Sequence, residues 1–335
     1  MNKEQQAPST ESQAEKLRDT FLSLTSELEK QIIGQKDSIS RALIALFCGG
    51  HVLIEGVPGL GKTKLVKSIA KAIDADYSRI QFTPDLMPAE LLGTHVISND
   101  QSGIKNVEFR KGPIFGNIIL ADEINRATPK TQSALLEAMQ EGSVTTANQS
   151  FKLDDPFTVF ATQNPLEMEG TYPLPEAQLD RFFFKITFKS PNKKELHDIL
   201  KITTHSNQEP IHPVITKEQI LTSRQFILSV PVTDPVMDYA VRLLRATHPD
   251  TEQATKLVKR YVRHGASPRG AQSMIWAAKA MALLDNRFAV AMEDIKAVAL
   301  PCLGHRIQIG FEGNADGIRS NEIIEDIIKS LPVAP

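Results

Sequence analysis

The chain has 335 residues, a hydrophobic content of 41% and a formal net charge of −2. The length favours about two domains, the hydrophobic content supports a sizeable core, and the near-neutral charge argues against a nucleic-acid-binding protein. The apolar run 42–48 is too short to cross a membrane, and the polar residues 1–15 lack the apolar core of a secretory signal. We therefore expect no membrane insertion and a cytoplasmic location. Cys48 and Cys302 stand far apart among apolar neighbours, which predicts buried thiols.

Residues 17–190 alternate between strand and helix patterns, after a polar segment, 1–16, that we expect to be a flexible tail. Five short apolar segments are typical of strands: 52–55, 78–82, 117–121, 157–162 and 183–188. Because helical patterns separate several of them, the sequence predicts a mostly parallel five-stranded sheet with helices on both faces, an α/β sandwich of three layers. Two insertions, at 94–113 and 143–152, have the polar turns and flanking apolar residues of hairpins.

Residues 191–335 are expected to form a smaller, all-α second domain. Pro191 breaks the preceding pattern, and Asn192 has the character of an N-cap. Helical patterns then cover 193–204, 216–229, 233–247, 268–285 and 291–301.

The segment 56–63 fits the phosphate-binding pattern Gly-x-x-x-x-Gly-Lys-Thr between a strand pattern and a helix pattern. Its glycines let backbone N–H groups turn toward a triphosphate, and the helix N-terminus adds the positive end of its dipole. Lys62 supplies a charge for the β- and γ-phosphates, and the Thr63 hydroxyl can bind Mg²⁺. The segment predicts ATP or ADP with Mg²⁺ as cofactors, bound by Gly56, Val57, Pro58, Gly59, Leu60, Gly61, Lys62, Thr63 and Lys64.

Polar residues follow two of the predicted strands. Asp122 and Glu123 end an apolar strand, at the edge where a parallel sheet binds its ligands. Asp122 is placed to hold Mg²⁺, and Glu123 to polarise the water that attacks the γ-phosphate. Asn164 follows the next strand, where it could orient that water or contact the phosphate; the alternative is an asparagine that caps a turn.

Two arginines could stabilise charge on the γ-phosphate during transfer. Arg181 precedes the aromatic strand pattern at 182–184, and Arg269 begins a helix of the second domain. Neither is close to the glycine loop in sequence, so each would have to approach through the fold or from a neighbouring subunit. The alternative for both is a structural ion pair.

Together these motifs resemble the AAA+ ATPases, and within them the MoxR family, over about residues 20–310. The resemblance depends on Ile-Gly-Gln at 33–35, the loop 56–63, Ala-Asp-Glu-Ile-Asn-Arg-Ala at 121–127, and the segments 161–165, 169–177 and 265–270. It implies a P-loop α/β nucleotide-binding domain followed by an all-α lid.

The resemblance also implies a role for each matched residue. The loop 56–63 corresponds to Walker A, Asp122 and Glu123 to Walker B, and Asn164 to sensor 1. Ile33 and Gly34 would line the adenine pocket. By the same resemblance, Arg181 is an arginine finger given to the adjacent subunit and Arg269 is sensor 2 on the lid.

For function, the resemblance implies a hexameric ring that hydrolyses ATP to ADP and phosphate. Hydrolysis would drive chaperone-like remodelling or maturation of a partner protein, and a protein with a von Willebrand factor A domain is a common partner. The two hairpins match insertions that face the pore of such rings.

Three other functions compete with this one. A nucleotide-dependent assembly switch with little turnover would not need Glu123, Asn164 and the two arginines. A nucleic-acid motor is disfavoured by the near-neutral charge and by the lack of interleaved basic and aromatic residues. A motor subunit of a metal chelatase stays open, although no accessory domain or metal cluster in the sequence supports it.

Overall fold

The computed structural model describes residues 10–99, 105–146, 149–165, 170–204 and 209–332. Contacts divide the chain into two compact units, one of residues 28–217 and one that joins residues up to 27 with 218 onward. Among the described residues, no helix is both long and apolar enough to span a bilayer. Both cysteines are free thiols. Cys302 is buried as expected, but Cys48 is only half-buried, so the prediction of two buried thiols was wrong for Cys48.

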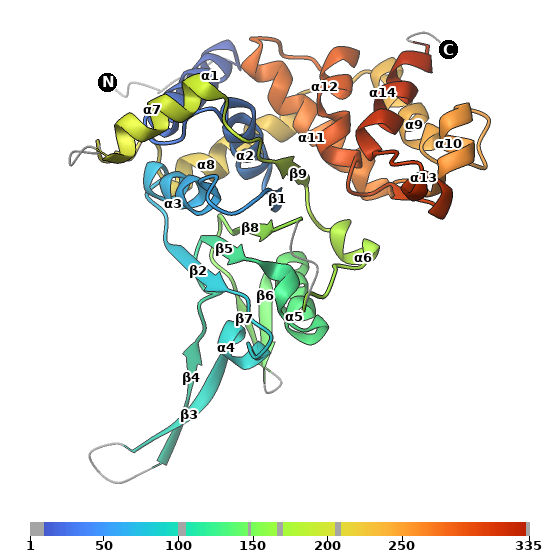
Figure 1. Ribbon diagram of the computed structural model, residues 1–335. Helices are drawn as coiled ribbons and strands as arrows, with labels where there is room; N and C mark the ends of the chain where they lie inside the picture. The colour runs from blue at the N-terminus through green and yellow to red at the C-terminus, as the bar shows by residue number, and fades with distance from the viewer. Residues whose placement is uncertain (1–9, 100–104, 147–148, 166–169, 205–208, 333–335) are drawn as a thin grey trace, which may run out of the picture. The chain divides into compact units, whose positions relative to one another are not determined.

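The sheet unit contains one five-stranded parallel sheet, as the sequence predicted. Its strands lie in the order β2, β5, β8, β1, β9, so β2 and β9 are the edges (Figure 1). Each strand falls within two residues of its predicted segment: β1 Val52–Glu55, β2 Tyr77–Gln81, β5 Ile118–Asp122, β8 Thr158–Gln163 and β9 Phe184–Thr187.

Helices cover both faces of the sheet, which gives the predicted three layers. On one face, α5 (Pro129–Glu141) joins Leu53, Ile119 and Val159 in a buried cluster. On the other, α3 (Lys62–Ala72) contacts β2 and β5, and α2 (Lys36–Cys48) contacts β9. Every side chain of the interior strand β5 is buried, as expected for a parallel strand between two helical layers.

Both predicted hairpins are present as two-stranded antiparallel arms. The first pairs β3 (Gly93–Asn99) with β4 (Lys105–Lys111) after the short helix α4 (Pro88–Leu92), and it extends beyond the sheet (Figure 1). The second pairs β6 (Ser143–Thr146) with β7 (Gln149–Lys152); the turns of both lie outside the described residues. Phe109 and Phe151 stack with ring centroids 4.2 Å apart, which joins the two arms.

The base of the first arm is held by backbone contact. Gly93 has φ of +108°, and a Cβ there would lie 2.4 Å from the carbonyl oxygen of Arg110. A Cβ on Gly112 would lie 2.4 Å from the carbonyl oxygen of Leu91. Real side chains do not approach backbone so closely. Only glycine therefore allows the two backbone segments at the base of the arm to lie this near each other.

The segment 191–217 groups with the sheet unit, although the sequence pattern placed the domain boundary at 190. It includes α7 (Lys193–Thr204), and its later part is tied to the sheet unit by hydrogen bonding and charge. The Val214 N–H donates to the Ala72 carbonyl at 2.8 Å, and Lys217 Nζ lies 3.6 Å from Asp76 Oδ2. The sequence pattern becomes helical after residue 190, but residues up to 217 make most of their contacts within the sheet unit.

At the other end, helix α1 (Thr10–Glu29) begins inside the segment expected to be a polar tail. Its buried residues Ala14, Leu17, Phe21 and Leu24 recur at helical spacing. The flexible tail 1–16 was therefore wrong for residues 10–16, because this spacing anchors them as helix. Residues 1–9 lie outside the described residues.

The second unit is helical, as predicted, but not purely so. The expected helices are α8 (Lys217–Ser229), α9 (Asp234–Ala246), α11 (Pro268–Leu284) and α12 (Met292–Leu303). The sequence reading missed α10 (Lys256–Tyr261), α13 (Phe311–Ala315), α14 (Ser320–Ser330) and an antiparallel pair, β10 (Val262–His264) with β11 (Gln308–Ile309). The expectation of an all-α domain was wrong at this pair, because its strands of three and two residues are too short to show a periodic pattern.

His51, just before β1, links the strand that leads to the glycine loop with its neighbours. The Val159 N–H donates to His51 Nδ1 at 3.0 Å, so the ring proton is on Nε2, which donates to the Met139 carbonyl at 3.0 Å. One ring thus satisfies a strand amide and a helix carbonyl.

Replacing His51 with leucine should remove both hydrogen bonds while keeping an apolar side chain. We expect the free energy of unfolding to fall by about 1–3 kcal/mol, the usual cost of leaving buried polar groups unpaired. Denaturant unfolding measures the change, with His197→Leu as the control because His197 is exposed on α7. Equal stability of the two variants would contradict the linking role.

Candidate nucleotide-binding site

The glycine loop connects β1 to α3 and opens toward solvent. Gly59 and Gly61 have φ of +84° and +88°, values that favour glycine. Apart from the adjoining residues of the chain, no atom of the described residues lies within 4 Å of the position that a Cβ would take at either glycine. The loop therefore has room for a group that approaches its backbone N–H groups, and α3 begins directly after it.

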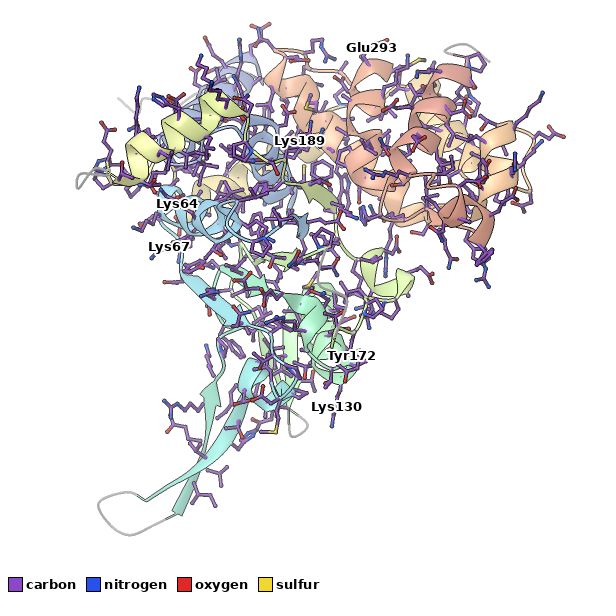
Figure 2. All side chains as sticks on the ribbon, in the orientation of Figure 1. Lys64, Lys67, Lys130, Tyr172, Lys189 and Glu293 are labelled. Carbon is purple, nitrogen blue, oxygen red and sulfur yellow. The ribbon has the colours of Figure 1, made fainter. Side chains whose placement is uncertain are left out.

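Lys62 is the first residue of α3, and its side chain folds back over the loop. Its Nζ donates to the Gly56 carbonyl at 2.5 Å and to the Gln163 carbonyl at 3.4 Å. Thr63 and Lys64 follow in the first turn, both half-buried, and burial lowers the pKa of Lys64. Figure 2 labels Lys64 and Lys67 on α3; Lys67 is exposed. The predicted phosphate-binding lysine thus lies across the loop, at the ends of β1 and β8.

Asp122 ends β5 with its carboxylate largely buried and fully engaged. Thr162 Oγ1 donates to Oδ1 at 2.6 Å. Arg79 donates to Oδ2 from Nε at 3.1 Å and from Nη2 at 2.7 Å. The residue predicted to hold Mg²⁺ is therefore fixed by a hydroxyl on one oxygen and a guanidinium on the other.

Glu123 has an uncommon backbone conformation for a residue other than glycine. Its φ of +57° lies in the left-handed region, which costs roughly 1–2 kcal/mol for an L-residue. Its N–H donates to Thr162 Oγ1 at 2.9 Å, so one hydroxyl binds both neighbouring acids. Its Oε2 accepts from Gln81 Nε2 at 2.9 Å and pairs with Arg126 Nη1 at 3.2 Å. These contacts direct the predicted general base away from the buried core.

Asn164 follows β8 directly and is buried. In the sheet register, Ala121 lies opposite Ala161 and Glu55 lies opposite Gln163, so β5, β8 and β1 end at the same edge. The structure thereby brings together the glycine loop, the two acids and the asparagine, all from the carboxyl ends of adjacent parallel strands. This is the position in which open α/β sheets bind their ligands.

Ile33 and Gly34, predicted to line the adenine pocket, lie between α1 and α2. Ile33 is half-buried, and Gly34 has φ of +75°. A Cβ on Gly34 would lie 2.7 Å from Cδ of Glu195, so this segment packs against the start of α7. The adjacent Gln35 donates from Nε2 to the carbonyl of Lys189, labelled in Figure 2, at 2.8 Å.

The two predicted arginines belong to different units. Arg181 lies between α6 (Glu176–Leu179) and β9, and its Nη1 donates to the Leu136 carbonyl of α5 at 2.7 Å. Its Nε is buried without a hydrogen-bond partner among the described residues. Arg269 is exposed in the first turn of α11, in the helical unit, and its N–H donates to Ser267 Oγ at 3.2 Å. The structure thus holds Arg181 on α5 and leaves Arg269 at a helix N-terminus.

Comparison with known proteins gives the same picture. Residues 51–184 match the model of the ATPase family associated with various cellular activities (AAA), and residues 254–327 match the AAA lid domain. Chaperone MoxR1 of Mycobacterium tuberculosis is 38% identical over 308 residues, 91% of this chain and 80% of that protein. Protein MoxR of Methylorubrum extorquens is 31% identical over 334 residues, 94% of each chain. The chain belongs to the MoxR family of AAA+ ATPases.

Two further matches cover almost the whole chain. A crystal structure from Cytophaga hutchinsonii, described as that of a presumptive ATPase, superposes with a TM-score of 0.88 at 42% identity and covers 96% of both chains. Protein YeaC of Bacillus subtilis, described as uncharacterized, is 43% identical over 309 residues, 91% of this chain and 92% of that protein. The α/β fold with its lid, inferred from the sequence, is therefore confirmed as the AAA+ fold.

AAA+ ATPases use a nucleotide with Mg²⁺, and the residues present fit both groups. The open side of the loop gives a triphosphate access to backbone N–H groups, and Lys62 adds a cation. Thr63 and Asp122 offer oxygen ligands, which Mg²⁺ prefers. Among the described residues no cluster of three or more acids, histidines or cysteines could hold a metal alone. Mg²⁺ usually takes one or two protein ligands together with phosphates and water, a number that Thr63 and Asp122 can supply.

The sequence reading missed four residues that surround the acids: Arg79, Gln81, Arg126 and Thr162. Arg79 and Gln81 alternate with buried Ile80 on β2, which puts their side chains on one face of the sheet. This pattern was visible in the sequence. The sequence could not show that β2 lies beside β5, because the alternation of buried and exposed residues along one strand does not specify its neighbour in the sheet.

Replacing Lys62 with alanine should weaken ATP binding by about 10- to 100-fold. The side chain would supply a charge-assisted hydrogen bond to phosphate, typically about 1.5–3 kcal/mol. Titration with a fluorescent ATP analogue measures the affinity.

Lys67→Ala is the matched control, because it removes the same charge from an exposed position one turn later on α3. Affinities that are equal in wild type and in a folded Lys62→Ala variant would remove the loop from the site.

Proposed function

We propose that the chain hydrolyses ATP to ADP and phosphate and uses the cycle for chaperone-like remodelling or maturation of a partner protein. The observation that carries this proposal is the placement of Glu123 beside Asp122, at the edge of the sheet where Lys62 crosses the glycine loop. A protein that only bound nucleotide would need the loop and the metal ligand but no adjacent base.

In this proposal each residue has a separate task. Lys62 neutralises the β- and γ-phosphates, while Thr63 and Asp122 hold Mg²⁺, which supplies charge neutralisation on the phosphate oxygens. Glu123 accepts a proton from the attacking water, and Asn164 orients that water. Thr162 supports both acids, because its hydroxyl donates to Asp122 and accepts from the Glu123 N–H. Ile33 and Gly34 would contact the adenine.

A ring assembly completes the proposed site. We assign Arg181 as an arginine finger that acts on the neighbouring subunit of a homohexamer, and Arg269 as a lid residue that senses the γ-phosphate. The exposed position of Arg269 in the first turn of α11 supports this role, because a ligand can approach a surface residue at a helix N-terminus. For Arg181 the support is the family motif, since its own contact in the subunit is to α5.

The partner is proposed to be a protein, and no nucleic acid is expected. One relative is named a chaperone, and the sheet unit carries two hairpin arms, of which the first extends beyond the sheet (Figure 1). On the first arm, Ile97 and Val107 lie opposite each other and are 69% and 68% exposed. Paired apolar side chains of this kind suit contact with a polypeptide. A von Willebrand factor A-domain partner and a cytoplasmic location, with both cysteines free, belong to the same proposal.

One observation favours an assembly switch with little turnover as the second candidate. The Glu123 carboxylate is engaged by Gln81 and Arg126, and a base held in this way does not activate water until those contacts open. The rate of ATP turnover separates the two candidates. A chelatase motor subunit stays a prediction from the sequence, tested by whether metal insertion into a partner requires the chain.

Replacing Glu123 with glutamine should preserve ATP binding and reduce turnover by about 10²–10⁴-fold, the usual contribution of a general base. The amide has almost the same size but cannot take a proton. Phosphate release and nucleotide affinity are measured on the same preparation. If turnover stayed near that of the wild type, Glu123 would not be the base, and if the wild type itself showed negligible turnover, the switch would be favoured.

Replacing Arg181 with alanine should leave ATP affinity unchanged and reduce turnover by roughly 10³–10⁵-fold, the range for an arginine finger. Mixing Arg181→Ala subunits with Glu123→Gln subunits should restore part of the activity, since some interfaces then pair an intact Glu123 with an intact Arg181. Failure of every mixing ratio to rescue, in rings verified by mass, would argue for action within one subunit. A purely structural role through Leu136 would instead lower thermal stability without rescue.

A further inference from the structure

Arg79 is placed to act on Asp122 from the edge of the sheet. It lies in β2, the edge strand, and in the parallel register it is opposite Leu120, two residues before Asp122. Its guanidinium therefore reaches along β5 to the end of the strand. The side chain is 49% exposed and the Asp122 side chain 12%, so a partly solvated cation covers a largely buried acid.

The contacts leave Asp122 without an unoccupied oxygen. Arg79 places two N–H groups on Oδ2, and the Thr162 hydroxyl takes Oδ1. A carboxylate oxygen offers about two acceptor sites, so Oδ2 is fully used. A metal ion that binds Asp122 at Oδ2 must first displace at least one of these guanidinium contacts.

Electrostatic repulsion also sets Arg79 and Mg²⁺ against each other at Asp122. A guanidinium and Mg²⁺ that share one carboxylate repel each other, and the repulsion is strongest where water is excluded. The half-exposed Arg79 has a second partner that would remain, because its Nη2 also donates to Gln81 Oε1 at 2.8 Å. The arginine can thus leave the carboxylate without leaving the site.

We propose that Arg79 is a built-in counter-ion that competes with Mg²⁺ for Asp122, and so sets the Mg²⁺ concentration at which the metal–nucleotide complex binds. The proposal rests on the proposed metal-binding role of Asp122. It assigns Arg79 as a positioning residue, since it acts on the metal through Asp122 and contacts neither substrate nor reacting atoms.

The test measures how Mg²⁺ changes the affinity for ADP. A fluorescent ADP analogue is titrated at a series of Mg²⁺ concentrations into wild type, Arg79→Ala and Arg79→Lys. In Arg79→Ala the half-saturating Mg²⁺ concentration should fall by about two- to tenfold, a modest effect because the arginine is partly solvated. Arg79→Lys keeps the charge but loses the two-point contact, so its value should lie between the other two.

Arg260→Ala is the control, because Arg260 is a similarly exposed arginine paired with Glu312 in the helical unit. Its half-saturating Mg²⁺ concentration should equal that of the wild type. A half-saturating concentration in Arg79→Ala that is unchanged or higher than in wild type would overturn the proposal. Melting temperatures recorded in parallel confirm that each variant is folded, and a lower melting temperature with an unchanged Mg²⁺ response would mark Arg79 as merely structural.

Asp122→Ala distinguishes this failure from a failure of the metal assignment. If that variant retains the Mg²⁺ dependence of the wild type, Asp122 does not hold the metal. The metal-binding role of Asp122 and the competition by Arg79 are then both refuted. If Asp122→Ala loses the dependence while Arg79→Ala behaves as wild type, the metal assignment stands and only the competition by Arg79 is refuted.

Discussion

One backbone carbonyl, that of Gln163, connects the parts of the site. It accepts the Gly56 N–H at 3.2 Å and lies 3.4 Å from Lys62 Nζ. It can do so because Gln163 is the last residue of β8 and pairs with Glu55, the last residue of β1. The position of the glycine loop over the sheet therefore depends on the register of two parallel strands. A slip of one residue would turn every side chain of β8 to the opposite face.

The sequence predicted what is strongly periodic or locally coded. The five strands appeared near their expected places because most are short, mainly apolar runs, and the four helices of the second unit because their apolar residues repeat with the helical period. The two hairpins were marked by their polar turns. The glycine loop and the two acids followed from local motifs. The chain ends were harder: polar residues between Ala14 and Leu17 concealed the first turns of α1, and β10 with β11 is too short to repeat.

Contacts among the site residues were less predictable than the residues themselves. Nothing in a single sequence says that Arg79 and Gln81 of one strand meet Asp122 and Glu123 of another, because that meeting depends on strand order. The boundary between units had the same limit. The helical pattern changes at residue 190, while the contacts that hold 191–217 to the sheet unit join residues far apart in sequence, such as Ala72 and Val214.

The glycine pair at the base of the first arm has a consequence for how this protein can vary. Gly93 and Gly112 let backbone segments meet closely where the arm leaves the fold, and Phe109 of β4 adds ring contacts to Phe115 and Phe151. Exposed side chains farther along the arm, such as Ile97 and Val107, take no part in these contacts and can be exchanged without re-aiming the arm. The two glycines cannot be exchanged in the same way, since a Cβ at either would push the crossing chains apart. The arm thus combines a base that accepts only glycine at two positions with exposed strand residues that can vary.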